Sequence, residues 1–170
     1  ITLPNTLTII GSDAFDGCQS LTTINLPKSL TTISDSAFNA CTGIINITIP
    51  DSVTVLDEQT FSGCTNLTNI HIPDTITKFG RQCFLNCTSL SNITIPNSVT
   101  TFDDEVFRGC TNLTRVTINT NILMSDRATQ DNMLKNIFGA QVTDYIIGND
   151  VTLISPYAFQ DCIDLESINL

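Results

Sequence analysis

The sequence predicts an α/β solenoid, in which one repeated coil stacks on copies of itself, and three observations support this. A unit of 23 residues recurs without a gap, beginning at Ile1, Ile24, Ile47, Ile70, Ile93 and Val116. Its opening segment alternates apolar and polar residues, which is typical of a β-strand. Most units also place Phe three residues before Cys, a spacing that fits one turn of α- or 3₁₀-helix. A fixed period in this range indicates a linear array instead of one compact domain.

The repeats also divide the chain. The unit that starts at Val116 is stretched over residues 116–144, and regular units start again at Tyr145 and Ile168. We therefore expect residues 1–170 to form a single array with one irregular coil. Because the sequence opens and closes within the repeat pattern, we interpret it as a piece of a longer array.

The opening segment of each coil is expected to pair in parallel with that of the next coil. Ile47-Thr48-Ile49 and Ile70-His71-Ile72 each turn two aliphatic side chains inward and one polar side chain outward. Pro follows in five units and ends the strand, because it has no N–H. A second short extended stretch with an outward threonine should follow. Before it comes a side-chain oxygen able to accept hydrogen bonds from turn N–H groups, at Thr6, Ser29, Ser52, Thr75, Ser98, Asn121 and Asp150.

Phenylalanine and cysteine each recur in one slot of the repeat and should form columns in the core. The phenylalanines are Phe15, Phe38, Phe61, Phe84, Phe107 and Phe159, and the cysteines are Cys18, Cys41, Cys64, Cys87, Cys110 and Cys162. Adjacent coils lie about 4.8 Å apart, wider than the roughly 3.8 Å between Cβ atoms that a disulfide prefers. We predict a ladder of buried free thiols that packs as a hydrophobic column. Paired disulfides and a metal site are the alternatives, although the chain has no Cys-x-x-Cys pair.

Composition and motifs argue against several classes of function. The net charge is −10 with only seven Lys plus Arg, which disfavours nucleic acid and anionic lipid as partners. No apolar run approaches the roughly 18 residues that span a bilayer, so this segment should not insert into a membrane. We find no phosphate loop, no Gly-x-Ser-x-Gly and no Cys–His pair, and expect neither an enzyme nor a cofactor. The acidic clusters at 57–58 and 103–105 lack a calcium-loop pattern and should be solvated.

The unit read from Leu21, LTTINLPKSLTTISDSAFNAC, carries a resemblance to a known family. Its Leu-x-x-Ile-x-Leu core has the spacing of a leucine-rich repeat. The added Pro-x-Ser-Leu-Thr-x-Ile and Ala-Phe-x-x-Cys segments resemble the BspA-like branch of that family over nearly the whole chain. The resemblance implies a right-handed, arc-shaped leucine-rich repeat solenoid, on a cell surface or secreted, with a parallel sheet on its concave face. It also implies adhesion to host matrix proteins or to other microbial cells, without catalytic residues.

On such a concave face the outward side chains of the opening strands would meet a ligand. We predict that contact for Asn25, Asn46, Thr48, Asn69, His71, Asn92, Thr94, Arg115 and Thr117. A plain solvated face of β-favouring side chains is the competing interpretation. His71 is the only histidine and is expected to be exposed, not a metal ligand.

The stretched unit departs from the template. Met133, Leu134, Ile137 and Phe138 have helical spacing, so we expect a short amphipathic helix over Asp131–Phe138. Its apolar side should dock on the array and replace the missing Phe and Cys slots. Alternatively, Asn119–Asn132 projects and contacts a partner.

These observations favour a non-enzymatic protein-binding or adhesion module that recognises an extracellular protein or a cell-surface macromolecule. Repetition gives an extended surface, which suits large ligands. The main alternative is a passive spacer or stalk that presents other domains. Carbohydrate binding is a minor alternative, because sugar sites use aromatic platforms and this chain has two Tyr and no Trp.

Overall fold

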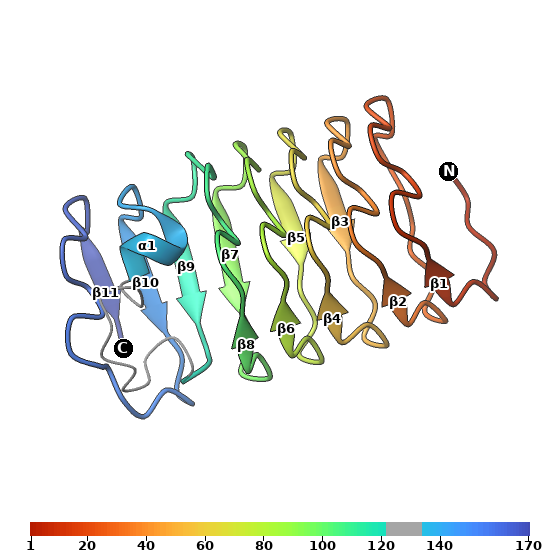
Figure 1. The fold of residues 1–170 in the computed structure, drawn as a ribbon. Helices are drawn as coiled ribbons and strands as arrows, with labels where there is room; N and C mark the ends of the chain where they lie inside the picture. Colours follow the sequence, from red (N-terminus) through yellow and green to blue (C-terminus); the bar gives the residue numbers. More distant parts are fainter. Residues whose placement is uncertain (122–133) are drawn as a thin grey trace.

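A computed structural model describes residues 1–121 and 134–170 of the chain. It is a solenoid whose coils stack in one file from the N-terminus to the C-terminus (Figure 1). We number the coils from the first, which begins at Ile1, to the seventh, which begins at Tyr145. The repeat period therefore predicted the architecture correctly. Handedness and the curvature of the sheet face stay predictions.

The opening segments form a parallel β-ladder on one side of the stack, as predicted. Its strands are β3 (Asn46–Thr48), β5 (Asn69–His71), β7 (Asn92–Ile95), β9 (Arg115–Ile118), β10 (Asp144–Ile147) and β11 (Ser167–Asn169). β3 pairs with β5, and β7, β9, β10 and β11 form a continuous sheet. Ile47 lies beside Ile70 and Ile93 beside Val116, so equivalent positions are aligned. In the second coil only Asn25 takes part, through a single bridge to Thr2.

The predicted second extended stretch forms a separate ladder. It comprises β1 (Ile9–Ile10), β2 (Thr32–Ile33), β4 (Val55–Leu56), β6 (Lys78–Phe79) and β8 (Thr101–Phe102). β1 pairs with β2, and β4, β6 and β8 form a three-stranded sheet. The outward threonines form hydrogen bonds between coils. The hydroxyls of Thr31 and Thr77 each donate to the backbone carbonyl of the preceding coil's threonine at 3.1 Å. The hydroxyls thus bond to backbone rather than to one another.

The segment from Phe to Cys is a turn and does not form the predicted helix or 3₁₀-helix. Cys18 N donates to Phe15 O at 3.0 Å, which is a local 3₁₀-type bond. Alternate N–H groups point to the next coil instead: Phe15 N donates to Ala37 O at 2.9 Å and Gly17 N to Asn39 O at 2.8 Å. Asp16 N, by contrast, donates to Asp13 O of its own coil. Left-handed residues cause this alternation, because φ is 57° at Asp13 and 68° at Gly17. A regular helix cannot continue through such residues.

The serine hydroxyls that follow the proline slot donate hydrogen bonds, whereas we predicted that they would accept hydrogen bonds from N–H groups of their own turn. Ser29 Oγ donates to Leu7 O, and Ser52 Oγ and Ser98 Oγ each donate to a carbonyl of the preceding coil, all at 2.6 Å. They therefore join coils instead of holding their own turns. Asn121 does accept, from Thr152 N at 2.8 Å.

The phenylalanine column is a stack of nearly parallel rings. Ring centroids of Phe15, Phe38, Phe61 and Phe84 follow one another at 5.2, 5.5 and 5.7 Å, with interplanar angles of 2°, 2° and 6°. Phe107 continues the stack at 5.3 Å. Inner members are completely buried, so each coil covers the aromatic core of its neighbour.

The irregular coil supplies a substitute for this column. Helix α1 (Leu134–Phe138) buries Leu134 and Phe138. The Phe138 ring lies 5.2 Å from that of Phe107, and Ile137 is half-buried against the core. This confirms that the helix docks and fills the Phe slot. Residues 131–133 of the predicted helix and residues 122–132 of the proposed projecting loop lie outside the described part of the chain.

Replacing Phe61 with Ala should lower the free energy of unfolding by about 3–5 kcal/mol, because it removes a buried ring stacked on both sides. Urea denaturation followed by circular dichroism measures this. Phe15→Ala is the matched control: Phe15 is half-buried and stacked on one side, so its loss should be clearly smaller. Equal losses would contradict the account of the column.

Gly63→Ala should cost about 1–2 kcal/mol, because φ is 69° there and a Cβ is disfavoured in the left-handed region. The new Cβ would meet Ala40 only at an ordinary 3.5 Å, so backbone strain is the tested quantity. Gly11 has open space and no left-handed φ. Gly11→Ala should therefore be neutral or stabilising by up to about 1 kcal/mol in the same denaturation experiment. A neutral Gly63→Ala would refute the assigned turn.

Candidate ligand-binding face

The outward side chains of the main ladder form two rows, because the strands are in register. The first row runs through Asn46 and Asn69 and then through Asn92, Arg115 and Asp144. The second row contains the alternate outward positions, Thr48, His71, Thr94 and Thr117, and Asn25 precedes it in the second coil. The structure therefore brings the nine predicted residues onto one side of the stack. Eight of them are exposed, and Thr117 is half-buried.

The chemistry of the face changes along the stack. Asn46, Asn69 and His71 present uncharged amide and imidazole groups to solvent. Towards the C-terminus Arg115 lies 3.9 Å from the Asp144 carboxylate. Hydroxyl groups of Ser167, at 2.5 Å, and Thr143, at 2.8 Å, donate to that carboxylate and hold its pKa below the usual range. Thr143 and Ser167 were missed in the sequence, although Ser167 lies in the same outward slot as Arg115 and Asp144.

A groove of about 860 Å³ opens on the N-terminal half of this face. Its polar lining includes four predicted residues, Asn25, Asn46, Thr48 and His71. Ile24, Leu26, Ile47, Ile49 and Pro50 contribute its apolar lining, and Lys28 and Asp51 also border it. Sequence reasoning did not single out Lys28 or Asp51, since a groove depends on the separation of two coils and not on residue type.

The cysteine column is structural. All seven cysteines are free, which confirms the predicted free thiols and contradicts the disulfide alternative. The inner members of the ladder are buried as predicted, whereas Cys18 and Cys162 at its ends are half-buried. The ladder is not purely hydrophobic, because each inner thiol donates to a phenylalanine carbonyl of the preceding coil. Cys41 Sγ lies 3.0 Å from Phe15 O, and Cys64 Sγ lies 3.2 Å from Phe38 O. Burial raises the pKa of Cys41 to about 11 and that of Cys64 to about 12, so these thiols are poor nucleophiles at neutral pH.

Raising the pH above 9 should destabilise the protein through these thiols. The unfolded thiol titrates near 9.0, whereas the folded Cys64 thiol titrates near 12. Its stabilising contribution is complete below pH 9 and is lost as the pH rises towards 12, because the unfolded chain releases its proton first. The free energy of unfolding should therefore fall between pH 9 and 11, and less steeply in Cys64→Ala. Val53→Ala truncates a buried side chain without a titrating group and should keep the wild-type slope.

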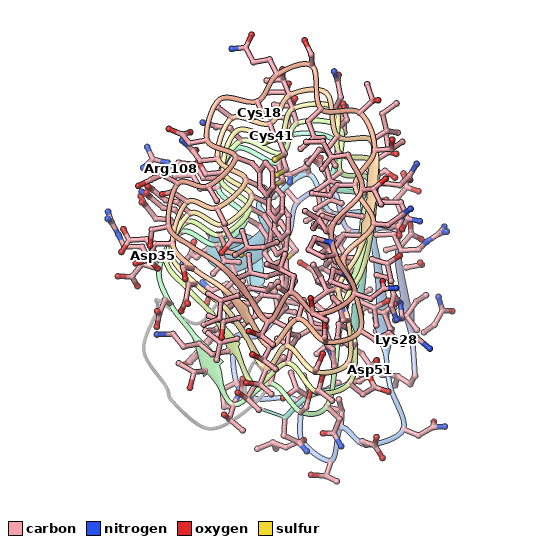
Figure 2. All side chains as sticks on the ribbon, turned by 90° about the vertical axis from the view of Figure 1, so that its right-hand side faces the viewer. Cys18, Lys28, Asp35, Cys41, Asp51 and Arg108 are labelled. Atoms are coloured by element: carbon pink, nitrogen blue, oxygen red, sulfur yellow. The ribbon has the colours of Figure 1, made fainter. Side chains whose placement is uncertain are left out.

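Most charged residues lie elsewhere on the molecule. Lys78 pairs with Asp103 at 2.8 Å, and Arg81 lies 3.5 Å from Glu58. Viewed along the stack, Asp35 and Arg108 lie on the side opposite Lys28 and Asp51 (Figure 2). Within residues 1–121 and 134–170, no three His, Cys, Asp or Glu side chains gather as a metal ion would need. In the same residues, no helix has the length and apolar character to span a bilayer.

Comparison with known proteins supports the resemblance. The family model described as a BspA type leucine rich repeat region, in six copies, matches residues 1–114 and 31–166. A leucine-rich repeat protein from Bacteroides ovatus is 26% identical with a TM-score of 0.71, over 100% of this chain and 45% of that one. The Treponema pallidum (T. pallidum) leucine rich repeat protein is 25% identical with a TM-score of 0.69, over 99% and 68% of the two chains.

A leucine rich cell surface protein from Faecalibacterium prausnitzii shares the fold, with a TM-score of 0.65 at 23% identity over 96% of this chain and 51% of that one. Comparison with curated proteins gives no match. The chain thus spans about half the length of two of these three structures. Leucine-rich repeat solenoids are generally non-enzymatic scaffolds, typical of protein-binding modules. With its repeats matched from residue 1 to residue 166, the chain belongs to the BspA-type leucine-rich repeat family.

Proposed function

We propose that this chain is a protein-recognition module, which binds an extracellular protein or a cell-surface macromolecule through the two outward rows of its main ladder. One observation carries the proposal: the ladder register aligns exposed Asn, Thr and His side chains of successive coils on a single face. Amide side chains offer both donors and acceptors, so such a face can bond to many points of a large ligand. The array would act at a cell surface or in secreted form, and the Faecalibacterium relative is named as a cell surface protein.

The alternative site chemistries have less support. The inner thiols are buried and donate to backbone carbonyls, so they do not serve as nucleophiles. The groove is open and shared between coils, which suits part of an extended ligand more than an enclosed small molecule. Its lining contains no Phe, Tyr or Trp platform, which disfavours carbohydrate.

Replacing Asn69, His71 and Asn92 with Glu should abolish or strongly weaken capture of the protein ligand. Three carboxylates in the centre of the face remove amide contacts and repel an approaching partner. The experiment is a pull-down of extracellular matrix proteins and surface proteins of other microbial cells by the immobilised chain, with identification by mass spectrometry.

The matched control adds the same three charges to the second ladder. Thr8, Thr54 and Thr101 are exposed there, and none of their hydroxyls donates a described hydrogen bond. Thr→Glu changes at these positions should preserve capture. If the chain captures nothing, it is a passive spacer. If the face variant still captures the same ligand, the wrong face has been assigned.

A further inference from the structure

On the sheet face the main ladder is interrupted between the second and third coils and again between the fourth and fifth, where β5 and β7 do not pair. At the fourth-to-fifth junction the second ladder stays closed, because β6 pairs with β8. The junction between the second and third coils is different. No described backbone hydrogen bond joins residues 23–26 to residues 46–49. The second ladder is interrupted at the same junction, because β2 pairs only with β1 and β4 only with β6. The core stays closed: Phe38 stacks on Phe61 at 5.5 Å, and Ser52 Oγ donates to Leu30 O at 2.6 Å. The opening is therefore confined to the ladders, and the groove of about 860 Å³ lies there.

The third-coil wall of the groove carries the extended backbone of β3. Ile49 N donates to His71 O at 3.1 Å, so this part of the third coil is bonded to the fourth. The backbone N–H and C=O groups of successive strand residues point to opposite sides of the strand. Because Ile49 N–H faces the fourth coil, the N–H and C=O groups of Thr48 and Asn46 face the second coil. They find no backbone partner among the described residues of that coil. The groove therefore offers main-chain donors and acceptors together with the Asn25 and Asn46 amides.

Lys28 supplies a charge to the rim. Five of the six described side-chain cations have a carboxylate within 4.0 Å, namely Lys78, Arg81, Arg108, Arg115 and Lys135. Lys28 has none among the described residues and is exposed. A second groove, of about 560 Å³, shares Asn25, Leu26 and Lys28 with the first, so the depression extends past Lys28 towards the first coil. An elongated ligand fits this shape.

We propose that the junction groove binds an extended peptide segment of the protein ligand, with an aspartate or glutamate side chain of that segment paired to Lys28. This inference rests on the proposed function and names its ligand chemistry. Main-chain groups and amides of the walls complement a peptide backbone, and the apolar lining accommodates its alternate side chains. The net charge of −10 does not prevent an acidic segment from binding. The groove itself is bordered by one Lys and one Asp, and distant charges are screened within about 8 Å at physiological salt.

The test uses the full, isotope-labelled chain and two synthetic peptides, acetyl-Ser-Val-Asp-Val-Ser-Thr-amide and its Asp→Asn counterpart. Backbone amide shifts at millimolar peptide report the site and the affinity. The Asp peptide should shift the signals of Asn25, Asn46 and Thr48. It should bind roughly two- to fivefold more tightly than the Asn peptide, which is the gain expected of one exposed ion pair.

Lys28→Gln should remove the preference for the Asp peptide. Lys135→Gln is the matched control, because it deletes the same charge from a lysine already paired with Asp161 at 2.7 Å, and it should keep the preference. Absence of shifts in the groove, equal affinity for both peptides, or binding of cellohexaose in their place would overturn the proposal. If the peptides fail while Asn69, His71 and Asn92 still control capture of a protein, the groove assignment is wrong and the recognition face stands.

Discussion

Each coil of this protein is too thin to bury its own apolar face, and stacking on the next coil solves that problem. The phenylalanine column shows the constraint directly, since each inner ring is buried between the rings of the two neighbouring coils. The ring spacing of 5.2–5.7 Å is slightly wider than the roughly 4.8 Å between paired strands, so each coil contributes one ring to the column. Any coil that changed its length without supplying a substitute ring would open the core. The irregular coil meets this condition with Phe138 from helix α1.

Polar side chains enforce the same register. Serine and threonine hydroxyls and cysteine thiols donate to carbonyls of the preceding coil, with the same partners in successive repeats. The serine bonds, such as that from Ser29 Oγ to Leu7 O, satisfy carbonyls that accept no described backbone N–H. The bonds of the outward threonines and of the cysteines add a second donor to carbonyls that already accept one. The recognition face is a consequence of this stacking. Once the inward residues are aligned, the outward residues between them must also fall into rows.

Much of this could be predicted from the sequence because the repeat reports every slot several times. The strand at Ile47–Ile49, the Phe61 stack and the free Cys64 thiol all follow from spacing and residue type. Hydrogen-bond direction could not be predicted, because a serine hydroxyl can donate or accept and Ser52 was assigned to the wrong role. In the sixth coil Thr120, not Asn121, donates to a carbonyl of the fifth coil, Val99 O at 2.8 Å. The sequence pattern does not reveal that the donating residue has moved one position, from Asn121 to Thr120.

The candidate site was likewise predicted only in part from the sequence. Alternation placed Asn46, Asn69 and His71 on one face, but it gave no indication that both ladders are interrupted between the second and third coils. That interruption depends on the separation of two backbones, which differs little between residues of similar type. That Lys28 has no carboxylate partner among the described residues became evident only when the partners of the other cations were known.

The central claim is that stability and surface both arise from contact between equivalent slots of adjacent coils. A double-mutant cycle on Phe38 and Phe61, with Phe38 and Phe107 as the distant pair, tests it most directly. The account predicts a coupling free energy of about 0.5–1.5 kcal/mol for the adjacent pair and none beyond error for the distant pair. Equal coupling in the two pairs, or none in the adjacent pair, would contradict it.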